Sequence, residues 1–288
     1  MTSPYTDLGR PPLHAAALRR ALVVPGGLYT DLQVVAETAS TNADVAAAGR
    51  AGAAEGLVVT AESQVAGRGR QGRGWSMPPR SGIAVSVLLR PDAAAGGRGG
   101  AEPAVKQARA ISSVAVPPAR YGWLPLLAGV ALVEAVRHVA DVDAVLKWPN
   151  DLLVGGRKCG GVLVEVHDGA AVVGIGVNTS LTAAELPVPT ATSLTLAGAA
   201  SADRDPLLRA LLRGLADHYR QWLAAGGDPV ASGLRENYLL HCSTVGREVR
   251  IHLPGGTSVS GPAGDIDADG RIVVAGTAYA AGDVVHLR

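Results

Sequence analysis

The chain has 288 residues, and 26 basic residues against 25 acidic residues leave a formal net charge of +1. That balance excludes a generally basic protein that binds nucleic acid or anionic membranes through its overall charge, and two cysteines exclude a disulfide scaffold or a multi-cysteine zinc site. Hydrophobic residues make up 48% of the chain, which is enough for a sizeable core in one large domain or in one large and one small domain.

Two scarce residue types mark positions of interest. Lysine occurs only at Lys106, Lys147 and Lys158, and asparagine occurs only four times. The composition is rich in Ala, Gly and Arg and lacks Phe. This composition indicates a coding bias against lysine, asparagine and phenylalanine. We therefore expect the few lysines and asparagines at positions where arginine or another polar residue could not replace them in function.

Residues 1–30 predict an N-terminal extension with one short helix around residues 14–22. This stretch does not resemble a secretory signal, because two arginines interrupt its apolar residues. The most apolar segment, residues 123–136, contains Pro125 and Glu134 and is too short to span a bilayer. We expect a cytoplasmic protein with no membrane segment.

The next segment alternates between strands and one helix. Apolar runs at residues 31–36, 56–61 and 83–89 predict three strands. A helix is expected over residues 43–48, with Ser40 as its N-cap.

A long insertion divides the strands from the main helices. Residues 91–120 are rich in Ala, Gly, Pro and Arg without periodicity, which predicts a mobile insertion. Beyond it, residues 126–139 predict a helix, and residues 160–166 and 171–177 predict a strand pair.

The C-terminal third changes character part-way. Asp205-Pro206 begins a predicted helix with an apolar stripe. Short strands, separated by turns at residues 254–256 and 269–270, then predict a small β-barrel. We expect an α/β domain over residues 31–241 and the barrel over residues 242–288.

A glycine- and arginine-rich segment follows the second predicted strand. Residues 67–72 read GRGRQG and formally match a dinucleotide-binding fingerprint, but two prolines follow where that fold needs a helix. The segment instead places Arg68, Arg70 and Arg73 among glycines, which suits close binding of phosphate or carboxylate groups. Taken alone, the segment fits the alternatives as well as it fits this anion-binding interpretation. The alternatives are a solvated basic loop and an arginine–glycine nucleic-acid-binding segment.

A second motif holds two of the three lysines. Residues 147–151 read KWPND, and Lys158 follows beside Gly160 and Gly161. A compact ammonium can contact a carboxylate and a phosphate oxygen at one point, which a planar guanidinium does less well. The alternative is a proline-containing turn with exposed lysines. Cys159 is expected to pack passively.

The motifs together resemble biotin–protein ligases. The resemblance extends over residues 35–288, and its order and spacing rest on Ser40–Asn42, Gln64, Gly67–Arg73, Lys147–Asp151, Arg157–Glu165 and Gly174–Asn178. It implies an α+β fold with a mixed sheet, of the class II synthetase-like biotin–lipoate ligase type, followed by a small C-terminal SH3-like β-barrel.

The resemblance also implies a reaction. Biotin and ATP form biotinyl-5′-AMP and pyrophosphate, with Mg²⁺ accompanying ATP, and biotin is then transferred to a lysine of a biotin carboxyl carrier domain. The first step joins two anions, so electrostatic stabilisation and positioning are its main requirements.

The family's roles carry over to matching positions. The resemblance implies that the catalytic residues are Lys158, Arg68, Arg70 and Asp151. Biotin would contact Ser40, Thr41, Asn42, Gln64, Arg68, Arg70, Lys158, Gly160 and Gly161. The nucleotide would contact Arg70, Arg73, Trp75, Lys147, Asn150 and Asn178. No residue is assigned to a metal, although Asp151 and Asn178 are candidates.

One departure from the family pattern concerns DNA. Many members carry an N-terminal winged helix-turn-helix, and the residues before the first matching motif contain no recognition helix. We expect a monofunctional ligase, monomeric or weakly dimeric, that acts on the carboxyl carrier domain of an acyl-CoA carboxylase and binds no operator DNA. Two alternatives stay open, a lipoate or octanoate ligase and a nucleic-acid-binding module.

Overall fold

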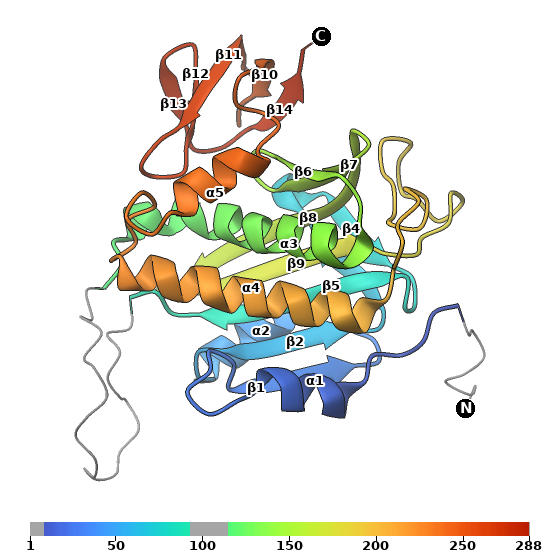
Figure 1. Ribbon diagram of the computed structural model, residues 1–288. Coiled ribbons are helices and arrows are strands. Elements are labelled where there is room, and N and C mark those ends of the chain that lie inside the picture. Colours follow the sequence, from blue (N-terminus) through green and yellow to red (C-terminus); the bar gives the residue numbers. More distant parts are fainter. Residues whose placement is uncertain (1–8, 93–114, 288) are drawn as a thin grey trace.

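A seven-stranded mixed sheet organises the computed structural model, which describes residues 9–92 and 115–287 (Figure 1). The β1–β2 pair is parallel and all other neighbours are antiparallel. In spatial order the strands are β1 Asp31–Val35, β2 Leu57–Ala61, β5 Gly82–Leu89, β9 Ala170–Asn178, β8 Arg157–His167, β7 Asp151–Val154 and β6 Ala144–Lys147. The predicted mixed sheet is confirmed.

The central strands are buried on both faces, which explains their continuous apolar sequences. Successive residues of β2 alternate between two separate cores, with Val58 in the larger core and Leu57 and Val59 in the smaller one. The β8–β9 hairpin turns at Asp168-Gly169, and both residues have positive φ, at 49° and 77°. This geometry is the primed turn that matches the twist of the strands.

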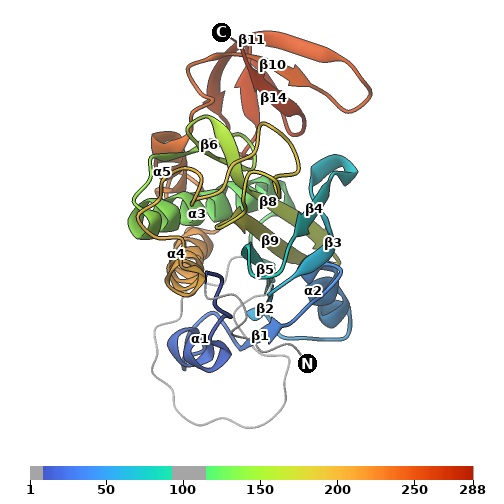
Figure 2. The same cartoon turned by 90° about the vertical axis from the view of Figure 1, so that its right-hand side faces the viewer.

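Helices cover the two faces unequally (Figure 2). The larger core lies under α1 Ala15–Leu22, α3 Leu124–Ala140 and α4 Arg204–Ala224, and α2 Thr41–Arg50 covers the other face. The predicted apolar stripe of α4 is fully buried. This helix begins two residues earlier than predicted, because its N-cap is Asp203 and not Asp205; the Asp203 side chain accepts a hydrogen bond from the Asp205 amide.

One helical stretch, Pro118–Ala140, is long and apolar enough to cross a membrane by length and composition, and most of it is buried inside the fold. It comprises the 3₁₀-helix η2 Pro118–Trp123 and α3. Burial on this scale is typical of a core helix. Most of the predicted insertion, residues 93–114, lies outside the described residues.

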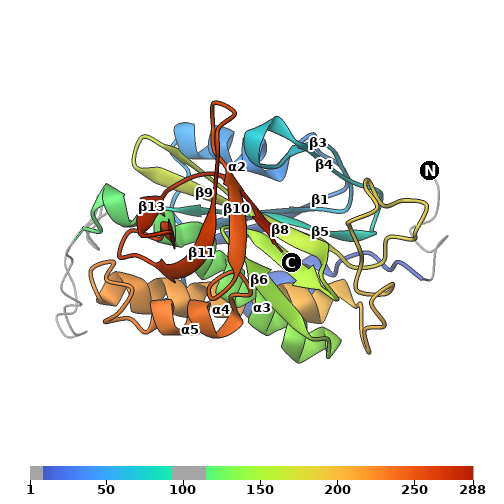
Figure 3. The ribbon, with the colours of Figure 1, turned by 90° about the horizontal axis from the view of Figure 1, so that it is seen from above.

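The C-terminal strands form a second sheet beyond β6, at the opposite end of the molecule from β1 (Figure 1), and seen from that end they lie in front of the central sheet (Figure 3). After α5 Leu234–His241, its antiparallel order is β13 Thr277–Tyr279, β12 Ile272–Val274, β11 Ser258–Ile266, β10 Glu248–His252 and β14 Asp283–His286. No pairing between the outer strands β13 and β14 closes this part of the described chain into a barrel. The SH3-like barrel therefore stays a prediction.

Two tryptophans attach the C-terminal sheet to the larger domain. The indole nitrogen of Trp148 donates to the Gly270 carbonyl at 3.2 Å, and that of Trp123 donates to the Ala268 carbonyl at 2.9 Å. Buried residues of β10 belong to the same hydrophobic core as α3. The sheet is thus fixed against the turn between β6 and β7.

Candidate active site

A cavity of about 810 Å³ opens on the α2 face of the central sheet. It is lined by fourteen of the fifteen predicted site residues: Ser40, Thr41, Asn42, Gln64, Arg68, Arg70, Arg73, Trp75, Lys147, Asn150, Asp151, Lys158, Gly161 and Asn178. Residues that are up to 138 positions apart in the sequence therefore meet around one space.

Glycines on β8 and β9 make the floor of the cavity. Gly161, Gly174 and Gly176 all line it, and a Cβ atom at Gly176 would lie 2.5 Å from Trp75 Cε2. Side chains at these positions would fill the space beside the sheet, so the glycines let the indole approach the backbone closely. The cavity follows β9 from Gly174 to Asn178.

One end of the cavity is polar and preorganised. Ser40 caps α2 by accepting from the Ala43 amide, as predicted. The backbone amide and hydroxyl of Thr41 donate to Gln64 Oε1 at 3.0 and 3.2 Å. These contacts fix the Gln64 amide at the cavity surface.

Two further residues, neither predicted to have this role, orient Asn42. Asn42 Nδ2 donates to Glu165 Oε2 at 2.7 Å, and Ser86 Oγ donates to Asn42 Oδ1 at 2.6 Å. Ser86 lies inside a fully buried strand, and a polar residue in such an apolar run is the signal that could have identified it.

Cations gather at the other end. Lys158 Nζ lies 2.5 Å from Asp151 Oδ1 and 6.0 Å from the centroid of the Trp75 ring. Burial lowers the pKa of Lys147, and the nearby charge of Asp151 opposes this shift. Asp151 therefore offsets the repulsion between two lysines that share the cavity.

The glycine–arginine segment is a hairpin, not the irregular loop that its glycines indicated. Strand β3 Gln64–Arg68 pairs with β4 Gly74–Met77, and the 3₁₀ turn η1 Arg70–Gly72 joins them. Positive φ angles at Gln71 and Gly72 allow the tight reversal. The hairpin stands beside α2, on the same face of the central sheet (Figure 2).

Each hairpin arginine has a different environment. Arg70 donates to Asn150 Oδ1 at 3.3 Å, and burial lowers its pKa, with Asp283 opposing the shift. Arg73 donates to Asp283 Oδ1 of β14 at 2.8 Å. Arg68 lines the cavity. Guanidinium groups keep their charge under such shifts, so the hairpin presents cations to the cavity.

The turn between β6 and β7 places Lys147, Asn150 and Asp151 at the cavity. Asn150 is held by its own Nδ2, which donates to the Val162 carbonyl at 2.9 Å. Trp148 is buried in the hydrophobic core and does not line the cavity. Cys159 is also buried, its thiol donates to the Asn178 carbonyl, and burial raises its pKa to about 12, which fits the passive packing expected from the sequence.

Part of the cavity wall was not predicted. The loop between β9 and α4 contributes Pro187, Val188, Thr190 and Ala191, and β14 contributes Val285 and His286. Burial and the charge of Lys147 lower the pKa of His286. These positions carry no local motif, and only the tertiary fold brings them to the site.

Gly160 is the one predicted site residue outside the cavity lining. A Cβ atom there would lie 2.7 Å from the Gly176 carbonyl oxygen on β9. Gly160 therefore permits close pairing of β8 with β9, and its contact with biotin stays a prediction.

No group of three or more His, Cys, Asp or Glu side chains in the described residues could hold a metal ion by itself. Asp151 and Asn178 both line the cavity, but the Asp151 carboxylate already pairs with Lys158. Any metal at this site would need most of its ligands from a bound phosphate and from water.

The model of the biotin/lipoate A/B protein ligase family matches residues 36–180, half of the chain. The chain belongs to this family. The matched segment includes the polar end of the cavity, the hairpin and the Lys147–Lys158 region.

Curated relatives extend this family match. A biotin–[acetyl-CoA-carboxylase] ligase of Mycobacterium tuberculosis is 40% identical over 290 residues, which cover 98% of each protein. The bifunctional ligase/repressor BirA of Bacillus subtilis is 30% identical over 77% of this chain and 62% of its own length.

Solved structures agree in fold. Biotin protein ligase from Aquifex aeolicus, in complex with biotin and ATP, has a TM-score of 0.67 at 22% identity and matches 90% of this chain and all of its own. Biotin protein ligase from Leishmania major, in complex with biotinyl-5-AMP, has a TM-score of 0.55 at 23% identity and matches 90% of this chain and 99% of its own.

We predict that Gly160→Ala lowers the free energy of unfolding by about 1–3 kcal/mol, because the new methyl group overpacks against the β9 backbone. Urea denaturation measures this change. Gly264→Ala is the matched control, since a Cβ atom there meets nothing within 4 Å. Equal stability of the two variants would contradict the packing role of Gly160.

Proposed function

We propose that the chain is an ATP-dependent biotin–protein ligase that makes biotinyl-5′-AMP and then transfers biotin to a lysine of a carrier domain. The observation that carries this proposal is the continuity of the cavity, which joins a preorganised polar end to the Lys158–Asp151 pair. The near full-length match to the Mycobacterium ligase supports it.

The polar end suits a ureido ring. Ser40, Thr41, Asn42 and Gln64 supply hydroxyl and amide groups. The Ala43 amide holds the Ser40 hydroxyl, and hydrogen bonds among the others and to Ser86 and Glu165 fix their orientation. A ureido group both donates and accepts, and amide side chains can match both functions. The valeryl chain of biotin would then extend along the glycine floor toward Lys158.

The cationic end suits the first reaction. A biotin carboxylate oxygen attacks the α-phosphorus of ATP, the new P–O bond forms, and the bond to the leaving pyrophosphate breaks. Lys158 and Arg70 face the space where these anions would meet, and they reduce the repulsion between nucleophile and phosphate. Trp75, Lys147, Asn150 and Asn178 would contact the nucleotide, and Arg73 and Arg68 would extend the cationic wall.

The second reaction requires the carrier lysine to reach the same point. The lysine arrives as an ammonium group and first loses one proton to water. Its neutral amine then attacks the acyl carbon of the mixed anhydride, the bond from that carbon to the AMP oxygen breaks, AMP leaves, and the nitrogen releases its second proton to water. Asp151 lies beside Lys158 at the cavity surface. We infer that it orients Lys158 toward the acyl phosphate and attracts the incoming ammonium group.

Mg²⁺ is expected to accompany ATP, and the donors present fit a shared site. One carboxylate, Asp151, and one amide, Asn178, line the cavity near the proposed phosphates. Mg²⁺ commonly binds through one or two such groups together with phosphate oxygens and water. When bound, it would neutralise phosphate charge and strengthen the pull on the leaving pyrophosphate.

The partner and location remain proposals. The carrier domain of an acyl-CoA carboxylase is the inferred acceptor, since the Mycobacterium relative is named for that enzyme, and ATP use is consistent with the cytoplasm. Among described residues, the segment before β1 forms α1, which packs on α4 and contains no helix-turn-helix. A monofunctional monomer or weak dimer that binds no operator DNA is the corresponding prediction.

Substrate-dependent ATP–pyrophosphate exchange tests the proposal. We expect exchange with biotin and at least about 100-fold weaker exchange with lipoate, because the polar end would leave buried amides unpaired against a dithiolane ring. Preferred exchange with lipoate or octanoate would instead establish the related acyl ligase activity. Salt-sensitive RNA or DNA binding without exchange would favour the nucleic-acid module.

We predict that Lys158→Ala reduces biotin-dependent exchange by at least about 1,000-fold, because it removes the cation at the reacting phosphate. Arg213→Ala is the control, since Arg213 is exposed on α4 and does not line the cavity. Thermal unfolding checks that both variants fold. Normal exchange by Lys158→Ala would remove Lys158 from the mechanism.

A further inference from the structure

The backbone of Lys158 is held by a loop far along the chain. Its amide donates to the Thr190 carbonyl at 2.9 Å, and its carbonyl accepts from the Thr192 amide at 2.8 Å. The same loop holds Asn178, whose Nδ2 donates to the Thr192 carbonyl at 2.9 Å. Displacement of residues 190–192 would therefore move two side chains that line the cavity.

The loop also forms part of the cavity wall. Pro187, Val188, Thr190 and Ala191 line the cavity, and they lie near Asn178, at the far end from Gly174. Under the proposed function this is the nucleotide end.

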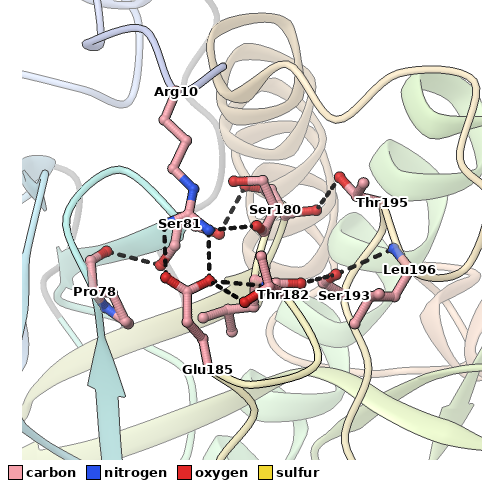
Figure 4. A network of polar contacts seen from close by, with 11 residues as sticks. Arg10, Pro78, Ser81, Ser180, Thr182, Glu185, Ser193, Thr195 and Leu196 are labelled. Carbon is pink, nitrogen blue, oxygen red and sulfur yellow. Dashed lines mark hydrogen bonds and ion pairs between the residues drawn. The ribbon is translucent and has the colours of Figure 1, made fainter. Parts of the chain in front are cut away.

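The first turn of this loop is tied to the N-terminal segment by Arg10 (Figure 4). Arg10 Nη1 donates to Glu185 Oε1 at 3.0 Å, and Nη2 donates to Glu185 Oε2 at 2.6 Å and to the Ser180 carbonyl at 2.7 Å. Glu185 in turn accepts from the amide and hydroxyl of Thr182, both at 2.9 Å. One guanidinium thus closes the turn from two sides.

Arg10 is itself firmly placed. It precedes Pro11-Pro12, which favours an extended backbone at Arg10. The Pro11 carbonyl accepts from the buried Arg204 at 2.5 Å, and the Leu13 amide donates to Glu62 at 2.6 Å. The buried Arg204 forms an ion pair with the partly buried Glu62 at 2.7 Å. The segment is therefore anchored to Glu62, which directly follows β2, and to the start of α4, and the Arg10 guanidinium needs little additional ordering.

We propose that Arg10 is a positioning residue for adenylate formation, acting through Glu185 and the 187–192 loop on Lys158 and on the nucleotide end of the cavity. This inference rests on the proposed function. It assigns part of the active-site geometry to residue 10 of the N-terminal extension, outside the predicted catalytic domain of residues 31–241.

The chemistry of the pair suits a permanent support. A bidentate arginine–carboxylate contact fixes direction as well as distance, and the side chains are only 16% and 31% exposed. The hydrogen bond from Arg10 holds the pKa of Glu185 at about 2. A carboxyl group whose pKa is lowered by folding stabilises the fold at pH values above its ordinary pKa, and this stabilisation is lost as the pH falls through the lowered pKa, here about 2. The link between Arg10 and Glu185 therefore stays intact near neutral pH.

Exchange kinetics with varied ATP and varied biotin test the proposal. For Arg10→Ala and Glu185→Gln we expect the KM for ATP to rise about five- to tenfold, kcat to fall, and the KM for biotin to stay within about twofold, because small misplacements at the reacting end are costly. The double variant should be no worse than the worse single variant, since both changes break one path.

Arg235→Ala is the matched control. Arg235 forms a similar two-contact pair with Asp265, at 2.5 and 2.7 Å, and neither residue lines the cavity. We expect unchanged KM values for this variant. Thermal unfolding shows whether each variant is folded. The fraction of enzyme that forms adenylate in a single turnover shows how much of the folded protein is active, so a misplaced active site is distinguished from a loss of folded protein.

Two results, each with an active wild type, would overturn the proposal and leave the ligase function intact. The first is an unchanged KM for ATP in both Arg10→Ala and Glu185→Gln. The second is an equal rise in the KM for ATP and the KM for biotin in these variants. If Arg10→Ala does not fold, Glu185→Gln alone decides. A wild type that forms no adenylate would contradict the ligase function itself.

Discussion

The ion pair between Lys158 and Asp151 is the interaction on which the site depends. Several cations must share one cavity in a chain of net charge +1, and their mutual repulsion would separate them without a carboxylate among them. At 2.5 Å, Asp151 holds Lys158 over the glycine floor and opposes the burial penalty on Lys147. Charge is thus concentrated locally, although the chain as a whole is nearly neutral.

Around this pair, backbone elements from the whole chain are brought to fixed places. Antiparallel β7 and β8 set Asp151 opposite Gly161, and β9 supplies glycines where the Trp75 ring approaches the sheet. The hairpin adds Arg68 and Arg70, and Asp283 links it to the C-terminal sheet. The small sheet is consequently part of the surroundings of the site.

Much of the fold and the membership of the site were predictable from the sequence, because local residue patterns determine them. Buried strands produced continuous apolar runs, α4 produced an apolar stripe, and Ser40 capped α2 as its position indicated. Fourteen of the predicted site residues share one cavity, since motifs at strand ends and turns are placed by the strands themselves. Their individual roles stay predictions.

The remainder depends on contacts that no local pattern records. Arg10 and Glu185 are 175 residues apart, and His286 reaches the cavity only because the C-terminal sheet packs beside the β6–β7 turn. Glycines in the 67–74 segment indicated a loop, yet their small size is compatible with a paired hairpin. The close approach of Gly160 to the β9 backbone is likewise set by strand pairing, while its biotin contact, implied by the family resemblance, stays a prediction.

Transfer of biotin to a carrier is the central claim, and mass spectrometry of the reaction tests it most directly. The full chain is incubated with biotin, Mg-ATP and a biotin carboxyl carrier domain, with a carrier lacking its acceptor lysine as the control. We predict that the intact carrier gains the mass of one biotinyl group only when ATP is present, and that AMP appears with it. An unmodified carrier under conditions in which a known biotin ligase modifies it would contradict the account.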